Sequence, residues 1–452
     1  MNIESLLEGM AHGRAGDVAQ SLAAMCRIGA AKKAGEYLVS VVEDAPTMDM
    51  LNDDDILEVA HSALKVYSYH HDQAYLLNIR PLLMRVQKIA DDSLTRTEME
   101  ISEPPPDDIE TPLEISSDEE SAEEEGEDWV ERLRTEMDEI REAADSEAES
   151  PKAETGEKHY QDEPATFAEY TRFVRLSTVL SQLLSFSDKI DIGEHTEMSD
   201  LAEQCRARAK EMADALRTGG EPPEELEVLT LLETASLFGL EGIDPEVMRV
   251  SIDSLLTADG LIRTSTMDES DHGCVTATLQ MAHYYSRLHN GDRVENILEA
   301  LSDVFSEYHM LPDFVISTSP LRVAGQRCSA AASSLLLVLL LDMIGYERAQ
   351  DLIVLSGVPD GWYTSLTPLT VKDLNLESGS AQVEVGISAN QHQIDVRTEY
   401  LPQELEVHVP VSRAMPMVKV YGGGVAGRFE DEISPHIRIV PLSDNVVLTF
   451  HK

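Results

Sequence analysis

The sequence predicts a mainly α-helical protein, either an all-α toroid or an α-solenoid, followed by a small C-terminal antiparallel β-sandwich. Two periodicities carry this prediction. Up to about residue 355, apolar residues recur at helical spacing in paired segments joined by short links. From Leu369 onward, apolar and polar residues alternate with a period of two between Gly, Pro, Asn and Asp turn signals.

The helical segments are bounded by ordinary start and stop signals, such as the acidic run at the start of the segment from Asp53 and the glycine at Gly29. One of them, Ser329–Ile344, contains the most apolar run of the chain, Ala330–Leu341, which is too short to span a membrane and is predicted to be a buried core helix. The expected helices span residues 3–11, 17–29, 31–42, 53–70, 73–90, 167–186, 198–216, 224–238, 245–257, 275–289, 294–308 and 329–344.

A strongly acidic segment interrupts the helical part. Residues 101–150 hold 21 Asp and Glu against 3 Arg, a balance of -18, among prolines and serines. Such a composition cannot bury enough apolar surface to order itself, so residues 101–165 are predicted to be a mostly disordered insertion. A spacer is the simple interpretation, and a docking site for a basic partner is the alternative. The expected organisation is residues 1–100 and 166–360 as the two parts of the helical domain, and 366–452 as the sandwich.

The overall composition excludes several classes of protein. The 452 residues include 35 Lys and Arg against 84 Asp and Glu, a formal net charge of -49, which disfavours binding to nucleic acid or to an anionic membrane. Four cysteines without a CxxC pair predict neither a disulfide framework nor a zinc site, and the N-terminus lacks the pattern of a secretory signal. We therefore expect a cytoplasmic protein.

Common cofactor and nucleophile motifs are absent from the sequence. There is no Walker motif and no GxSxG elbow, and Gly422–Gly424 lies between strands, where a turn is favoured over a phosphate site. His70, His71 and His272 lack partners at ligand spacing, apart from Cys274, so packed or solvated histidines are favoured over metal ligands. We expect no metal and no cofactor.

Several motifs, taken in order, resemble one known group of enzymes. A loop with Leu-Pro-Asp at 311–313, then AGQRCSAAASSLLLVLLLDMIG, then VLSGVPDGW and a β-sandwich are similar to the six-hairpin glycosidases, the glucoamylase and glycogen-debranching glucosidase group. The segments Arg14–Leu38, Asp53–Leu76, Gly260–Thr264 and Ala282–Val294 also resemble parts of that family. The resemblance implies an (α/α)6 barrel, a carbohydrate partner and hydrolysis of an α-glucan or another oligosaccharide.

Glycoside hydrolysis needs two carboxyl groups, one that protonates the leaving oxygen and one that activates water. The family's base follows a Pro in the loop before the Gly-Gln-x-x-Ser-Ala helix, and here Asp313 stands there, one methylene shorter than Glu. Candidate acids are Asp268, Glu269 and Asp271, or else Asp49 and Asp53–Asp55. A capping or loop-stabilising role is the alternative for each of these carboxylates.

The residues expected to bind substrate are few, because the chain has two tryptophans and only 5% aromatic residues. They are Trp362, Tyr284, Tyr285, Gln326 and Arg327. The low aromatic content and Asp313 in place of Glu favour a second hypothesis, a non-catalytic scaffold of the same fold that binds a glycan or a protein.

Overall fold

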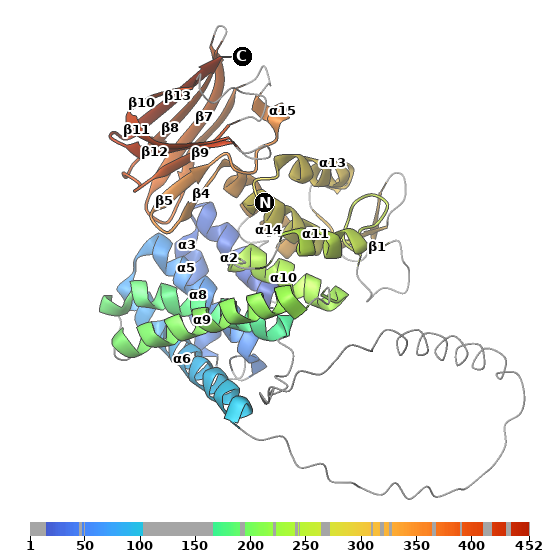
Figure 1. Ribbon diagram of the computed structural model, residues 1–452, viewed down its shortest axis with the longest axis vertical. Coiled ribbons are helices and arrows are strands. Elements are labelled where there is room, and N and C mark those ends of the chain that lie inside the picture. The colour runs from blue at the N-terminus through green and yellow to red at the C-terminus, as the bar shows by residue number, and fades with distance from the viewer. Residues whose placement is uncertain are drawn as a thin grey trace, which may run out of the picture. The chain divides into compact units, whose positions relative to one another are not determined.

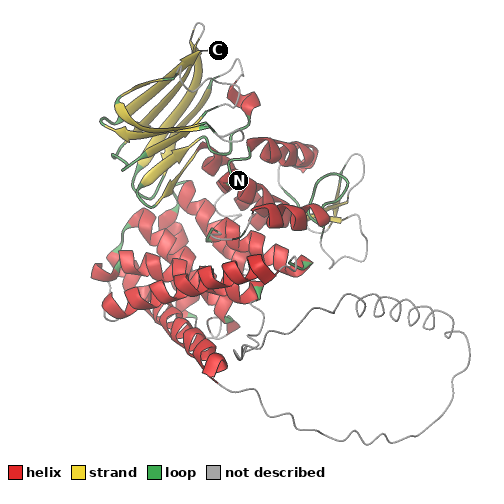
Figure 2. Cartoon of the chain, in the orientation of Figure 1, coloured by secondary structure: helices red, strands yellow, loops and turns green. Residues whose placement is uncertain are grey.

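The computed structural model shows a mainly helical protein whose antiparallel sheets lie in its C-terminal region (Figures 1 and 2). It describes residues 15–44, 48, 50–102, 166–189, 195–219, 223–239, 243, 245–263, 272–308, 311–316, 321–324, 328–363, 368–388, 391–409, 418–430 and 435–451. Nearly all of the acidic segment lies outside this part of the chain.

Among the described residues, six helices contact one another in cyclic order. Each of the six contacts the next of the six along the chain, and the last contacts the first, so the series closes on itself. We call them the inner helices; they are α2 (Ala15–Arg27), α5 (Asp53–His70), α8 (Phe167–Ser185), α10 (Glu225–Leu237), α12 (Val275–Arg287) and α14 (Ala330–Ile344).

The other long helices alternate with the inner ones along the chain. α3 contacts α2 and α5, α9 contacts α8, α11 contacts α10, and α13 contacts α12. Their bounds are α3 (Ala31–Glu43), α6 (Gln73–Ser102), α9 (His195–Gly219), α11 (Pro245–Ser254) and α13 (Gly291–Tyr308). α6 runs beyond the predicted end at residue 90, because no glycine or proline occurs between that residue and Pro104.

Local sequence signals start several inner helices. Asn52 and Asp55 form a reciprocal capping box at α5, and Thr166 and Glu169 form one at α8. In α14 the apolar run is buried on one side, as predicted, and Asp342 near its end is buried too. None of the described helices combines the length and apolarity of a membrane span.

Two five-stranded sheets make up the C-terminal region. Their strand orders are β10-β13-β8-β7-β6 and β11-β12-β9-β5-β4, and all pairings are antiparallel except β5 with β9. The first sheet contains β6 (Leu369–Asn375), β7 (Ser380–Ser388), β8 (Gln391–Thr398), β10 (Lys419–Tyr421) and β13 (Asn445–His451). The second contains β4 (Gly345–Arg348), β5 (Asp351–Val354), β9 (Leu405–His408), β11 (Gly423–Phe429) and β12 (His436–Pro441).

The second sheet recruits strands from before the predicted start of the sandwich at residue 366. β4 and β5 come directly after α14 and pair with each other, and β5 also pairs with β9, although the sequence predicted the end of the helical domain here. Strands this short show too few alternations to be recognised by periodicity. One continuous hydrophobic cluster runs from the inner helices into both sheets.

Candidate functional site

The loops that precede α12 and α14 are joined by a small three-stranded sheet, which we call the rim sheet. Its strands are β1 (His272–Cys274), β2 (Phe314–Ile316) and β3 (Arg322–Ala324), in the order β1-β2-β3. Asp313 lies directly before β2, and its backbone carbonyl accepts a 2.9 Å hydrogen bond from the N–H of Val275, the first residue of α12. The rim sheet therefore holds Asp313 beside the start of α12.

Asp313 is half-buried and lies near a thiol. Burial, together with the Asp313 carboxylate, raises the pKa of Cys328, whose side chain is exposed just before α14. The three acids predicted to face Asp313, namely Asp268, Glu269 and Asp271, lie outside the described residues, as do Gln326 and Arg327. That Asp313 faces one of these three acids across a cleft therefore stays a prediction.

The predicted aromatic residues are described, and they are packed. Tyr284 and Tyr285 are only 7% and 4% exposed on α12, with their rings 5.7 Å apart. Trp362, in the short helix α15 (Asp360–Tyr363), is half-buried against the hydrophobic core. Because a sugar ring stacks on an exposed aromatic face, the two tyrosines serve packing in this conformation.

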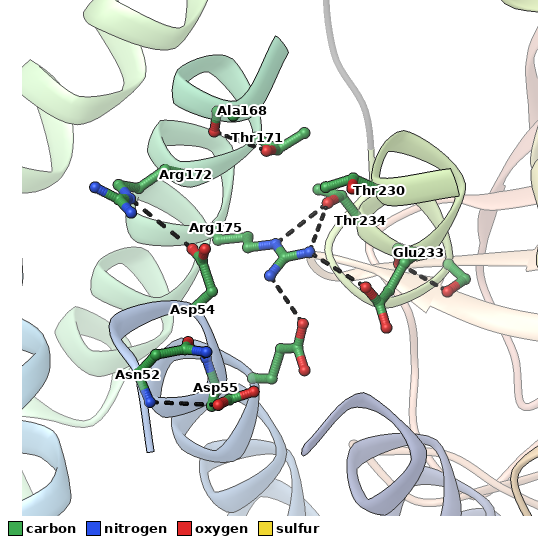
Figure 3. Close-up of polar contacts among 12 residues, drawn as sticks. Asn52, Asp54, Asp55, Ala168, Thr171, Arg172, Arg175, Thr230, Glu233 and Thr234 are labelled. Atoms are coloured by element: carbon green, nitrogen blue, oxygen red, sulfur yellow. Dashed lines mark hydrogen bonds and ion pairs between the residues drawn. The ribbon is translucent and has the colours of Figure 1, made fainter. Parts of the chain in front are cut away.

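Two glutamates on different inner helices share one arginine inside the ring. Arg175 of α8 donates from Nη1 to Glu58 Oε1 of α5 at 2.8 Å, and its Nη2 lies 3.6 Å from Glu233 Oε2 of α10. Nε and Nη2 also donate to the Thr234 hydroxyl at 3.2 and 3.1 Å. Figure 3 shows the guanidinium of Arg175 pointing toward Glu233 and Thr234. We call Glu58, Arg175 and Glu233 the glutamate pair with its arginine.

The two carboxylates of this pair have different surroundings. The Glu58 side chain is 6% exposed, whereas that of Glu233 is 35% exposed. Burial and the nearby Glu233 charge raise the pKa of Glu58 well above its usual range, although Arg175 opposes the shift. A buried carboxyl that stays protonated near neutrality beside a more exposed carboxylate is the pattern of an acid and base couple.

A second charged group joins the C-terminal ends of three inner helices. Asp342 of α14 accepts from Arg27 of α2 at 3.2 Å and from Arg287 of α12 at 2.8 Å. Burial alone would raise the pKa of Asp342, but the two guanidinium groups lower it below its usual value. Burial lowers the pKa of His283, 3.7 Å from Asp342, to about 4, so this imidazole is neutral at pH 7.

Arg27 also ties the helices to the sheets. Its Nη2 donates to the carbonyl of Gly345 at 2.7 Å, and its Nη1 donates to the carbonyl of Asn375 in β6 at 2.9 Å. Asn375 returns a 2.6 Å hydrogen bond to the carbonyl of Cys26. Asp342 therefore joins α14 to α2 and α12 through Arg27 and Arg287. Arg27 in turn joins these helices to the first sheet through Asn375.

A polar cavity of about 40 Å³ lies among the inner helices. Gln20 bonds Ser236 across it at 3.0 Å, and His61 bonds Gln182 nearby at the same distance. Burial lowers the pKa of His61 to about 3. The volume suffices for a few water molecules but not for a sugar ring. The lining comprises Ala19, Gln20, Ala23, Cys26, His61, Ser62, Lys65, Ser236, Leu237, His283, Arg287, Val338 and Asp342.

Sequence reasoning missed the glutamate pair, although a signal was present. Glu58 stands between Leu57 and Val59, and Arg175 between Val174 and Leu176, so each charge interrupts a run of buried apolar residues. Charges at such positions are rarely buried without a partner. The chain has 84 acidic residues, and the packing of the helices decides which of them pairs with which arginine. The periodicity of the sequence does not predict these pairs.

Comparisons with known proteins leave the family open. No protein-family model matches the sequence, and no curated protein shows significant similarity to it.

Proposed function

We propose that the chain is an (α/α)6-barrel protein that acts on carbohydrate, hydrolysing a glycosidic bond with two carboxyl groups. Two lines support the barrel: the cyclic contacts of the six inner helices and the order of motifs that resembles the six-hairpin glycosidases. The C-terminal β-sandwich that follows α14 agrees with that order.

The observation that carries the proposal is the glutamate pair with its arginine. Glu58, with its raised pKa, keeps a proton to give to the leaving oxygen, and Glu233, which is more exposed, accepts one from water. Arg175 holds both carboxyl groups by one guanidinium. Asp313, held by the rim sheet, is the alternative to Glu233 as the base, and it is the base that the family resemblance implies.

The test is hydrolysis of α-glucans, oligosaccharides and aryl glycosides by the full chain and its variants. We expect turnover by the wild type, and loss of about 10²-fold or more in kcat on Glu233→Gln, which keeps the side-chain shape and removes the base. Asp313→Asn decides whether Glu233 or Asp313 is the base, because only the variant of the true base loses turnover. Asp214→Asn is the matched control: Asp214 pairs with Arg217 on the surface of α9 and should keep full activity.

A second candidate is a non-catalytic scaffold of the same fold that binds a glycan or a protein. The cavity of about 40 Å³ and the buried tyrosines favour a scaffold that binds a protein, because neither offers a sugar ring a place to bind. Oligosaccharide binding by calorimetry without turnover on any substrate would support the scaffold. Turnover by the wild type that Glu233→Gln or Asp313→Asn abolishes would reject it.

A further inference from the structure

Two histidines and a glutamate from distant parts of the chain meet beside the second five-stranded sheet. His289 follows α12, whereas Glu406 and His408 lie on β9. One ligand atom of each residue lies within 4.8 Å of those of the other two. We call His289, Glu406 and His408 the His-Glu-His cluster.

The strand geometry places two of the three donors side by side. Residues two apart on a strand point to the same face, so Glu406 and His408 project together from β9. All four residues of β9 are buried, because this strand lies between β12 and β5. His408 Nε2 lies 3.0 Å from Glu406 Oε1.

The end of α12 supplies the third donor in a fixed position. His289 has a φ of 61°, in the left-handed region, and its N–H bonds the carbonyl of Ser286 at 3.0 Å. Its ring stacks on that of His408 with centroids 4.2 Å apart. Nδ1 of His289 is buried without a hydrogen-bond partner among the described residues. The left-handed backbone is the usual end of a helix, and the N–H of Asn290 bonds the carbonyl of Tyr285 to complete it. The observation that points to a ligand is therefore the buried Nδ1, which has no partner among the described residues.

Two arginines orient the carboxylate of the cluster. Arg348 Nη2 and Arg438 Nε bond the other oxygen of Glu406, Oε2, at 3.3 and 3.1 Å. Bonds of this kind to the distal oxygen of a ligating carboxylate are common around metal ions. Ca²⁺ and Mg²⁺ need several oxygen ligands, whereas two imidazoles and one carboxylate suit Zn²⁺.

We propose that His289, Glu406 and His408 bind one Zn²⁺ ion that joins the end of α12 to β9. Three protein ligands leave a fourth position for water, as in many zinc sites. With Zn–N bonds of about 2.0–2.1 Å, tetrahedral donors lie roughly 3.4 Å apart, so small rotations of the three side chains bring them into place. The site uses none of the residues of the glutamate pair with its arginine and does not depend on the proposed hydrolysis.

The test is zinc binding by the full chain after treatment with a chelator. Calorimetry and elemental analysis after dialysis give affinity and stoichiometry. The main variant is His289→Asn, because asparagine tolerates the left-handed backbone while lacking the imidazole. Glu406→Gln removes the anionic ligand, and His392→Gln, at a buried histidine of β8 in the other sheet, is the matched control.

We expect one zinc per chain in the wild type and in His392→Gln, and binding at least about tenfold weaker in His289→Asn and Glu406→Gln. Cobalt as a replacement should give the visible absorption of a low-coordinate nitrogen and oxygen site, and His289→Asn should abolish it. Wild type without stoichiometric zinc, or His289→Asn that binds zinc as tightly as the wild type, would overturn the proposal. Should Glu406→Gln fail to fold, His289→Asn decides alone.

Discussion

Arg175 Nη1 donates to Glu58 Oε1 at 2.8 Å, and the two side chains are 4% and 6% exposed. This contact joins α8 to α5 in the protein interior, and Glu233 of α10 approaches the same guanidinium. One cation thus faces two carboxyl groups, of which the more buried one is the easier to protonate. The pair has a consequence for stability that does not depend on any catalytic role.

The free energy of unfolding should fall as the pH rises above the usual pKa of a glutamate. Because the folded state raises the pKa of Glu58, it binds this proton more tightly than the unfolded chain does, and the stabilisation is lost as the pH rises toward the folded-state pKa. One such proton gives a slope of up to about 1.4 kcal/mol per pH unit. Glu58→Gln, which cannot titrate, should flatten the slope in urea unfolding measured across this range. An equal slope in wild type and Glu58→Gln would show that Glu58 does not titrate there.

The helices were predictable from the sequence because their signals are local. The capping boxes at Thr166 and Asn52 and the apolar run of α14 each lie within a few consecutive residues. β4 and β5 were missed because four residues carry little periodicity, and their place in the sheet depends on β9, about fifty residues later.

The site was less predictable than the fold, for a different reason. Asp313 was singled out through the resemblance to the six-hairpin glycosidases, whose base follows a proline in this loop, and its role stays a prediction. The contact of Arg175 with Glu58 and Glu233, and that of His289 with Glu406, join residues far apart in the chain. Such contacts depend on how the helices and sheets pack. Neither the composition nor the spacing of residues in the sequence predicts which residues that packing brings together.

Asp342→Asn should destabilise the protein strongly. The substitution leaves the guanidinium of Arg27, which is buried, without its anionic partner, and removes the bond from Arg287. Breaking a buried ion pair on one side costs about 3–5 kcal/mol, measured by urea unfolding. Asp214→Asn is the control, because its pair with Arg217 is 53% and 60% exposed and should change stability by less than about 0.5 kcal/mol. Similar losses in the two variants would contradict the structural role of Asp342.

Gly422→Ala should destabilise the turn between β10 and β11. Gly422 has a φ of +80°, and a Cβ there would lie 2.0 Å from the carbonyl oxygen of Asn445. Strain of this kind costs on the order of 1–3 kcal/mol before the clash is counted. At Gly424, two residues later, a Cβ meets nothing within 4 Å, so Gly424→Ala should change the melting temperature little. Equal melting temperatures for the two variants would show that the backbone at Gly422 relaxes freely.

Replacing residues 103–160 by a flexible Gly/Ser linker should leave cooperative unfolding intact. Residues Met1–Arg96 and Pro164–Lys452 belong to one unit by their contacts, and α8 has its own start signal in the capping box of Thr166 and Glu169. The helices on the two sides therefore do not need the acidic segment in order to fold.

A linker of about 15 residues makes the loop shorter, and it should stabilise the protein by roughly 1 kcal/mol, since each halving of loop length contributes about 0.6 kcal/mol. Guanidinium unfolding followed by circular dichroism and by tyrosine fluorescence should give coincident transitions. Separate transitions, or a loss of more than about 2 kcal/mol, would mean that the acidic segment contributes contacts to the folded unit.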